Sequence, residues 1–249
     1  ERDLLHPSAV LALLSAAFDS ESVEIRTSAY VCLGNIIAGS PTVGLPLLSR
    51  AMETEKHRYV AIHALKEAIP TAQTPPVRGG EYLKANCTGL LDMLFSHCDE
   101  AEEGVRVVLA ECLGLLLTLS PAAGVERAVA RLEEGDWKTR ACVVMATKFA
   151  YAESDNAVLR EQLATHMPAF MKAVDDAHPY VRRAALLMIT YFARHEKGYV
   201  IQSLDLGLLT SLLQQCRVNF DLVRVVDLGD GLYVTDDGVD VRKAAYECL

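Results

Sequence analysis

The sequence is poor in aromatic residues and has no long hydrophobic run. Only 6% of its 249 residues are aromatic although 51% are hydrophobic, so small aliphatic side chains must form the core, as expected where helices stack closely. No apolar segment reaches the roughly 18 residues that a membrane-spanning helix needs. The best candidate, 105–119, is interrupted by Arg106 and Glu111. The sequence therefore predicts no membrane partner.

Positive charge is also scarce. The chain has 24 Lys and Arg against 33 Asp and Glu, a net charge of −9. A nucleic-acid backbone attracts basic surfaces, so we expect no nucleic-acid partner. A basic or amphipathic protein surface is the favoured partner instead.

The chain lacks the sequence motifs of catalysis and of cofactor binding. It has no P-loop, no G-x-S-x-G and no dinucleotide fingerprint. Seven cysteines, an odd number without framework spacing, predict free thiols in a reducing compartment, and hence a cytoplasmic and nuclear location. His97-Cys98 is the only His–Cys neighbour pair, and no second pair lies at a zinc-like spacing.

Two acidic stretches near the end of the chain have simpler explanations than chemistry. The stretch 227–231 resembles a calcium loop but lacks the alternating acidic ligands and the closing Glu, so a hairpin turn explains it better. The stretch 236–240 precedes Arg242 and is typical of a helix cap rather than of an acid/base pair. We expect no enzyme, no metal, no cofactor and no small-molecule substrate.

What the chain does contain is an internal repeat. Six expected helices each begin near an arginine that follows a short acidic or polar turn: Arg26, Arg58, Arg106, Arg140, Arg182 and Arg242. The arginines recur on average about every 43 residues, within the range of roughly 40–47 for HEAT and armadillo arrays. The sequence therefore predicts an all-α fold, a right-handed α-α superhelix of HEAT/armadillo type with one inserted β-hairpin.

The residues after each arginine predict one inward face repeated six times. Six and seven places on, eleven of the twelve residues are apolar: Cys32-Leu33, Ala64-Leu65, Cys112-Leu113, Ala146-Thr147, Met188-Ile189 and Cys248-Leu249. A small residue lies earlier on each of the same helices, at Ala29, Ala61, Ala110, Ala141, Ala185 and Ala245. The cysteines in this register are expected to be buried core residues.

An acidic residue stands six places before four of the arginines, at Glu100, Glu134, Asp176 and Asp236. We expect it to cap its own helix and to form an ion pair with its own arginine, as in the Asp/Arg ladder of HEAT repeats.

The predicted helices follow from this register. The repeated helices are expected near 24–37, 57–69, 104–118, 136–151, 178–194 and 239–249, side by side in one layer. Their partners are expected at 4–18, 42–52, 82–96, 122–132, 157–174 and 200–215. The Pro/Gly-rich segment 71–80 is interpreted as a loop between repeats.

Strand character enters the chain only at 217–238. Two β-branched runs flank Gly229-Asp230-Gly231, which predicts a β-hairpin. Neighbouring repeats bury only helix faces, so an inserted hairpin is expected to serve a partner. The residues predicted to bind the partner are Leu222, Val223, Arg224, Val225, Val226, Leu228, Leu232, Tyr233 and Val234. The expected organisation is a repeat array at 1–216, the hairpin at 217–238, and the start of the second helix of a truncated repeat at 239–249.

Seven stretches carry a resemblance to a known family: 25–30 (IRTSAY), 33–36 (LGNI), 63–69 (HALKEAI), 98–104 (CDEAEEG), 110–114 (AECLG), 180–185 (YVRRAA) and, most specifically, 235–248 (TDDGVDVRKAAYEC). They resemble the C-terminal part of the cullin-associated and neddylation-dissociated HEAT-repeat family, exchange factors of cullin–RING ubiquitin ligases. The chain departs from the family at Pro75-Pro76 and at Leu232-Tyr233, where the family has a more basic segment.

The resemblance implies a non-catalytic scaffold that binds the N-terminal region of a cullin. The hairpin would occupy the surface where the substrate-receptor adaptor docks, so that adaptor and scaffold compete and receptors can be exchanged. Two alternatives remain. One is a generic HEAT adaptor, of the phosphatase-scaffold or transport-receptor type, and the other is an enzyme with an unrecognised site.

Overall fold

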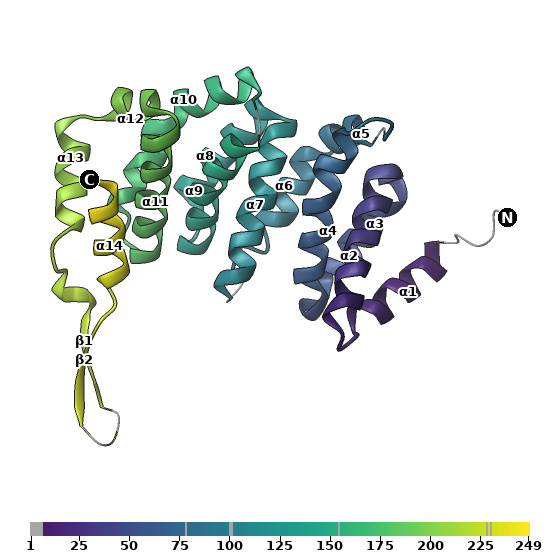
Figure 1. Ribbon diagram of the computed structural model, residues 1–249, viewed down its shortest axis with the longest axis horizontal. Helices are drawn as coiled ribbons and strands as arrows, with labels where there is room; N and C mark the ends of the chain where they lie inside the picture. The colour runs from purple at the N-terminus through teal and green to yellow at the C-terminus, as the bar shows by residue number, and fades with distance from the viewer. Residues whose placement is uncertain (1–6, 78, 100–101, 154, 228, 230) are drawn as a thin grey trace. The chain divides into compact units, whose positions relative to one another are not determined.

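Helices make up most of the computed structural model, which describes residues 7–77, 79–99, 102–153, 155–227, 229 and 231–249 (Figure 1). The chain forms two compact units, Glu1–Gly124 and Val125–Leu249. No helix in the described part of the chain is long and apolar enough to cross a membrane.

The first unit is built from helices that pack in pairs. It contains α1 (Pro7–Phe18), α2 (Val23–Gly39), α3 (Pro41–Glu53), α4 (Glu55–Gln73), α5 (Gly80–Ala85), α6 (Cys87–Phe95), α7 (Glu103–Leu119) and the start of α8 (Pro121–Glu134). The arginine-bearing helices α2, α4 and α7 are neighbours in that order, and α3 packs against both α2 and α4. A Cβ on Gly44 of α3 would lie 2.5 Å from the Cα of Ile37 in α2, so this glycine allows the two helices to touch closely.

The second unit repeats the pattern and adds the strands. It contains α9 (Trp137–Ala152), α10 (Ala157–Met171), the 3-10 helix η2 (Lys172–Asp175), α11 (Pro179–His195), α12 (Lys197–Ser203), α13 (Leu206–Gln215), the 3-10 helix η3 (Phe220–Leu222), β1 (Val223–Asp227), β2 (Leu232–Asp236) and α14 (Val239–Cys248). Here α11 packs between α9 and α14, and Phe170 and Phe192 are fully buried in the core. The hairpin extends away from the helices of this unit (Figure 1).

The predicted fold class is confirmed: paired helices of HEAT/armadillo type with one two-stranded antiparallel sheet in the described residues. All six arginine-bearing helices are present close to their expected limits, as α2, α4, α7, α9, α11 and α14. Two expected partner helices are each divided. At 82–96 the division falls at Asn86, whose side-chain amide donates to the Tyr82 carbonyl oxygen (2.8 Å) and competes with the helix. At 200–215, Asp205 caps a new helix by accepting from the Leu208 N–H.

The predicted inward face is largely confirmed. The alanines Ala29, Ala61, Ala110, Ala141, Ala185 and Ala245 are all buried, and so are both register positions of the helices α4, α7, α9 and α11. The prediction for Cys32 is wrong, because its side chain is exposed while Leu33 is buried. The Cys112 thiol explains the difference, because it donates to the Ile62 carbonyl oxygen of α4. The side of α7 that carries Cys112 therefore faces the preceding arginine-bearing helix.

That flank has no such neighbour at α2, which is the first arginine-bearing helix in the described residues. At the other end of the series, Cys248 is only half-buried and Leu249 is exposed. Periodicity therefore placed these residues correctly around their helices, but it could not show which flanks would be covered.

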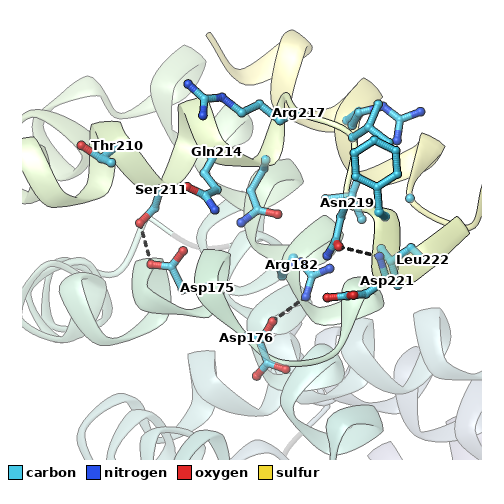
Figure 2. A pocket seen from close by; sticks show the side chains of 16 residues that line it. Asp175, Asp176, Arg182, Thr210, Ser211, Gln214, Arg217, Asn219, Asp221 and Leu222 are labelled. Atoms are coloured by element: carbon cyan, nitrogen blue, oxygen red, sulfur yellow. Dashed lines mark hydrogen bonds between the residues drawn. The ribbon is translucent and has the colours of Figure 1, made fainter.

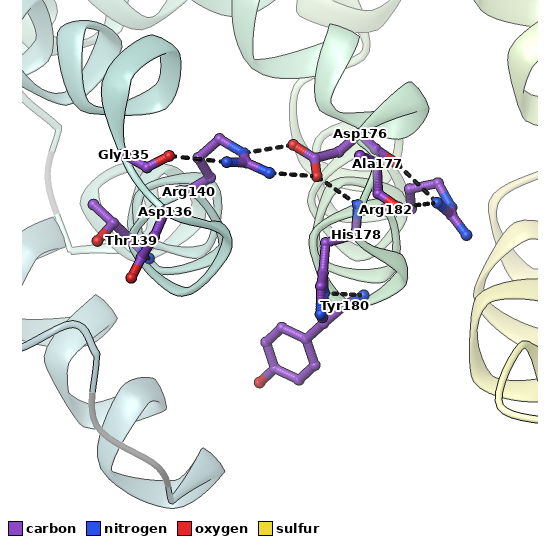
Figure 3. Close-up of polar contacts among 9 residues, drawn as sticks. All are labelled: Gly135, Asp136, Thr139, Arg140, Asp176, Ala177, His178, Tyr180 and Arg182. Carbon is purple, nitrogen blue, oxygen red and sulfur yellow. Dashed lines mark hydrogen bonds and ion pairs between the residues drawn. The ribbon is translucent and has the colours of Figure 1, made fainter. Parts of the chain in front are cut away.

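The repeated arginines hold the turns that precede their helices. Arg26 Nη1 donates to the carbonyl oxygens of Ser20 (2.6 Å) and Glu21 (3.0 Å). Arg182 Nη1 makes the equivalent bonds to Asp176 (2.8 Å) and Ala177 (3.0 Å), as Figure 3 shows. Carbonyl groups in a turn have no helical partner, so these arginines satisfy them in the same way in both units.

The expected role of the acidic residue six places earlier is confirmed only in part. Asp236 forms an ion pair with its own Arg242 (2.7 Å). The carboxylate of Asp176 instead accepts two hydrogen bonds from Arg140 of the preceding repeat, at 2.6 and 2.8 Å (Figure 3). Glu134 is exposed, and Glu100 lies outside the described residues.

The helix caps also differ from the prediction. They come from the residue four places before the arginine, at Ser22, Asp136 and His178. The reason is geometric. An N-cap side chain reaches only the N–H groups two or three residues further along the chain, and these helices begin three residues before the arginine. A residue six places before the arginine is therefore too far from the first turn to cap it.

Candidate functional site: the inserted hairpin

The hairpin forms where the sequence changes from helical periodicity to β-branched residues. Strands β1 and β2 pair antiparallel, with Val225 opposite Val234 and Val226 opposite Tyr233. At the turn, the Asp227 carboxylate accepts from the Gly229 N–H (2.8 Å), and Gly229 has a φ of +87°, which favours glycine. These features confirm the predicted hairpin, and Asp230 of its predicted turn lies outside the described residues.

Cross-strand pairing sorts the side chains onto two faces, because directly opposite residues point to the same side of a sheet. One face has Val223, Val225, Asp227, Leu232, Val234 and Asp236, and on it Val225, Leu232 and Val234 have exposed fractions of 63%, 74% and 73%. We call these three residues the apolar face. Exposed branched aliphatic side chains gathered on one side of a hairpin are typical of a protein-binding surface.

The opposite face is better covered. It has Arg224, Val226, Tyr233 and Thr235, of which Val226 and Thr235 are half-buried. Tyr233 is 46% exposed. Arg224 forms an ion pair with Asp237 (2.8 Å) at the base of the hairpin.

The base of the hairpin is fixed to α14. The Asp237 N–H donates to the Leu222 carbonyl oxygen (3.0 Å), which extends the ladder by one bond beyond the strands. The Asp236 carboxylate accepts from Arg242 in α14 and from the Gly238 N–H (2.9 Å). The hydrogen bond from Arg242, and then that from Gly238, hold the pKa of Asp236 below its usual value. An isolated two-stranded hairpin is marginally stable, so this attachment orients it.

The nine predicted partner-binding residues thus have different surroundings. Val225, Leu232, Tyr233 and Val234 are exposed, whereas Leu222, Val223 and Val226 are half-buried. Arg224 is exposed and paired with Asp237, and Leu228 lies outside the described residues. Binding by these residues stays a prediction, but the geometry selects the apolar face as its centre. Sequence reasoning missed Asp237, although its position directly after β2 is a signal for a contact at the base.

No group of three or more His, Cys, Asp or Glu side chains is placed to hold a metal ion in the described part of the chain. Burial raises the pKa of the Cys87 thiol to about 11, which makes it a poor nucleophile.

The paired helices and the projecting hairpin define a helical-repeat protein of HEAT/armadillo type. In agreement, the fold matches a chain in a solved structure that describes Kap95p binding to RanGDP, with a TM-score of 0.61 over 96% of this chain and 29% of that chain. The sequences are 15% identical, so this match shows the fold alone.

Sequence comparison identifies the family. Cullin-associated NEDD8-dissociated protein 1 of Arabidopsis thaliana is 34% identical over all 249 residues, which cover 20% of that protein. Cullin-associated NEDD8-dissociated protein 2 of Mus musculus is 34% identical over 240 residues, or 95% of this chain and 19% of that protein. A family model described as TATA-binding protein interacting (TIP20) matches residues 200–249, which include the hairpin. The chain belongs to the cullin-associated NEDD8-dissociated protein family, and it spans about a fifth of the length of these relatives.

Proposed function

We propose that this chain is a non-catalytic scaffold that binds the N-terminal region of a cullin. In this proposal the hairpin covers the surface on which a substrate-receptor adaptor docks, so that scaffold and adaptor displace each other and receptors are exchanged on cullin–RING ligases. The relatives are named for their association with cullins, which supports the choice of partner. The proposed setting is the cytoplasm and nucleus.

The observation that carries the proposal is the apolar face of the hairpin. Val225, Leu232 and Val234 are largely exposed on an element that is anchored at its base and contributes little to the helical core. In the proposed division of labour the helices of 1–216 grip the cullin, the hairpin of 217–238 excludes the adaptor, and 239–249 continues the array. Residues at the centre of an interface supply most of its binding energy, and the apolar face is expected to hold that position.

The test is displacement of an adaptor from a cullin N-terminal fragment. The variant Val225→Asp/Val234→Asp places two unpaired carboxylates on the surface that the cullin must bury. Removing a central contact costs about 2 kcal/mol or more, so we expect displacement to need at least roughly thirtyfold more protein. Binding to the cullin itself should weaken only in part, because the helices still make their contacts.

A matched control separates this effect from added charge. Val23→Asp/Val158→Asp changes two other exposed valines, on α2 and α10, and should displace the adaptor as well as the unchanged protein does. If Val225→Asp/Val234→Asp also displaces the adaptor normally, the hairpin does not compete and the proposed function is wrong. Far-UV circular dichroism and the melting temperature of both variants should match those of the unchanged chain, because all four valines are solvent-exposed.

A further inference from the structure

A second surface of interest is a cleft in the second unit, at the base of the hairpin (Figure 2). It has a volume of about 600 Å³ and is bordered by the start of α11, by α13 and by the segment 217–222 that leads into β1. The apolar face of the hairpin is not part of its lining, so the cleft is separate from the site described above.

A buried arginine with unused hydrogen-bond donors lines the cleft. Arg182 is only 8% exposed, and its Nη1 is occupied by the carbonyl oxygens of Asp176 and Ala177. Its Nε is buried and donates to no other group in the described residues. Burial lowers the pKa of Arg182 more than the nearby carboxylates raise it. The Nη2 group, which makes no hydrogen bond to the described residues and is not fully buried, is the donor that a ligand with an acceptor oxygen would use.

Side-chain amides form the facing wall. Gln214 and Gln215 at the end of α13 line the cleft, and neither side chain makes a hydrogen bond to the residues that the structure describes. Asn219 accepts from the Asp221 N–H (3.0 Å) through its oxygen, which leaves its amide N–H groups directed to the cleft (Figure 2). An amide offers both a donor and an acceptor, so this wall matches a ligand that alternates the two.

The residues that line the cleft disfavour both a phosphate and an apolar small molecule as its ligand. The carboxylates of Asp175 and Asp221 line the same cleft as Arg182 and Arg217, so a phosphate would meet repulsion as well as attraction. Pockets for small organic molecules are mostly apolar, whereas this lining is dominated by amides, hydroxyls and charges. A neutral ligand with regularly spaced donors and acceptors fits best, and the polypeptide main chain has that chemistry.

We propose that this cleft binds a short extended peptide segment of a partner protein through its main chain. An extended segment is favoured over a helix because the main-chain groups of a helix are already bonded to one another. Val218 and Phe220 border the cleft and are exposed, so one side chain of the peptide should be aliphatic or aromatic.

The test begins with selection from a phage-displayed library of random dodecapeptides on the immobilised 249-residue chain. Enriched peptides are then synthesised, and their binding is measured by fluorescence anisotropy. We expect Gln214→Ala/Gln215→Ala to weaken binding about tenfold or more, as the loss of hydrogen bonds to two amides should. The matched control Gln162→Ala/Gln202→Ala removes two amides on α10 and α12, outside the cleft, and should leave binding unchanged.

Backbone methylation of the peptide tests main-chain recognition directly. Replacing single N–H groups of an enriched peptide by N–CH₃ should abolish binding at alternate positions, because successive N–H groups of an extended chain point to opposite sides. Failure to enrich any peptide would overturn the proposal, and so would equal binding to the unchanged and the Gln214→Ala/Gln215→Ala chains. Binding that tolerates methylation at every position would show that the main chain is not recognised.

Discussion

The contact between α2 and α3 makes a sharp prediction at Gly44. A Cβ at this position would lie 2.5 Å from the Ile37 Cα and 2.7 Å from the Ile37 nitrogen. Carbon atoms pack at about 3.5–4.0 Å, so Gly44→Ala requires the two helices to separate by about 1 Å. Ile37 is fully buried, and its backbone cannot move aside as the end of a flexible side chain would.

Two opposing effects set the expected magnitude. Overpacking of a core costs roughly 1–3 kcal/mol, and the upper half of this range applies where the clash is with backbone. Replacing a helical glycine by alanine stabilises the helix by roughly 0.5–1 kcal/mol. We therefore expect Gly44→Ala to lower the free energy of unfolding of the first unit by about 1–2.5 kcal/mol.

Gly89 provides a matched control in the same unit. It lies in α6, and a Cβ there would meet nothing within 4 Å. Gly89→Ala should therefore stabilise the first unit by about 0.5–1 kcal/mol. Replacing glycine by alanine is therefore expected to lower the free energy of unfolding at Gly44 and to raise it at Gly89.

The assay is the labelling rate of the Cys112 thiol, which is fully buried in the first unit. Labelling under native conditions, followed by mass spectrometry of the peptide, reports the free energy of the opening that exposes this thiol. Faster labelling in Gly44→Ala and slower labelling in Gly89→Ala are expected. If the two variants protect Cys112 equally, the close approach of α2 and α3 does not limit the size of residue 44.

Four further predictions concern other parts of the molecule. Arg140→Ala removes both hydrogen bonds to Asp176 and should destabilise the second unit by about 1–3 kcal/mol in urea unfolding. Arg140→Lys keeps the positive charge and should destabilise this unit less. Equal losses of stability in the two variants would show that the charge of this pair does not matter. Burial alone would raise the pKa of Asp176, but the hydrogen bonds from Arg140 and from a backbone N–H outweigh burial and lower this pKa. The stabilisation by ionised Asp176 is therefore present above about pH 4 and is lost as the pH falls through the folded-state pKa. Asp176→Asn should flatten this acid dependence of the urea midpoint. Cys32 should react with a thiol reagent within the mixing time of a native sample and Cys112 only on opening, and equal rates would contradict their assigned burial. Tyr233→Asp should impair adaptor displacement less than Val225→Asp/Val234→Asp, because Tyr233 lies on the opposite face of the hairpin.

The sequence predicted the repeat well because its signals are local. An arginine at the start of each helix and a buried alanine near it recur wherever a helix must hold the preceding turn and pack closely on its neighbour. The hairpin was predictable for the same reason, since β-branched residues around a glycine-containing turn do not fit the helical period.

What could not be predicted depends on contacts between distant residues. Cys32 and Cys112 occupy the same register, but in the part of the chain that the structure describes only Cys112 has a preceding arginine-bearing helix against it. The bond between Arg140 and Asp176 joins two repeats, so spacing within one repeat gave the wrong partner. The division of the hairpin into two faces required the strand register, which places Val225 opposite Val234 and so separates Val225 from Tyr233.

The way in which the hairpin joins the helices has a consequence for protein engineering. Val223 and Asp236 are cross-strand partners, so the chain leaves and re-enters the array at points only about 5 Å apart. An insertion with adjacent ends places no geometric demand on the helices that flank it. The hairpin should therefore behave as an exchangeable cassette: strands lengthened by whole cross-strand pairs, or a different hairpin of the same register, can be grafted between η3 and α14 without displacing either. The same cassette, carried with Asp237 and Arg242, is a module for giving a designed helical-repeat protein a second binding element that projects from its array.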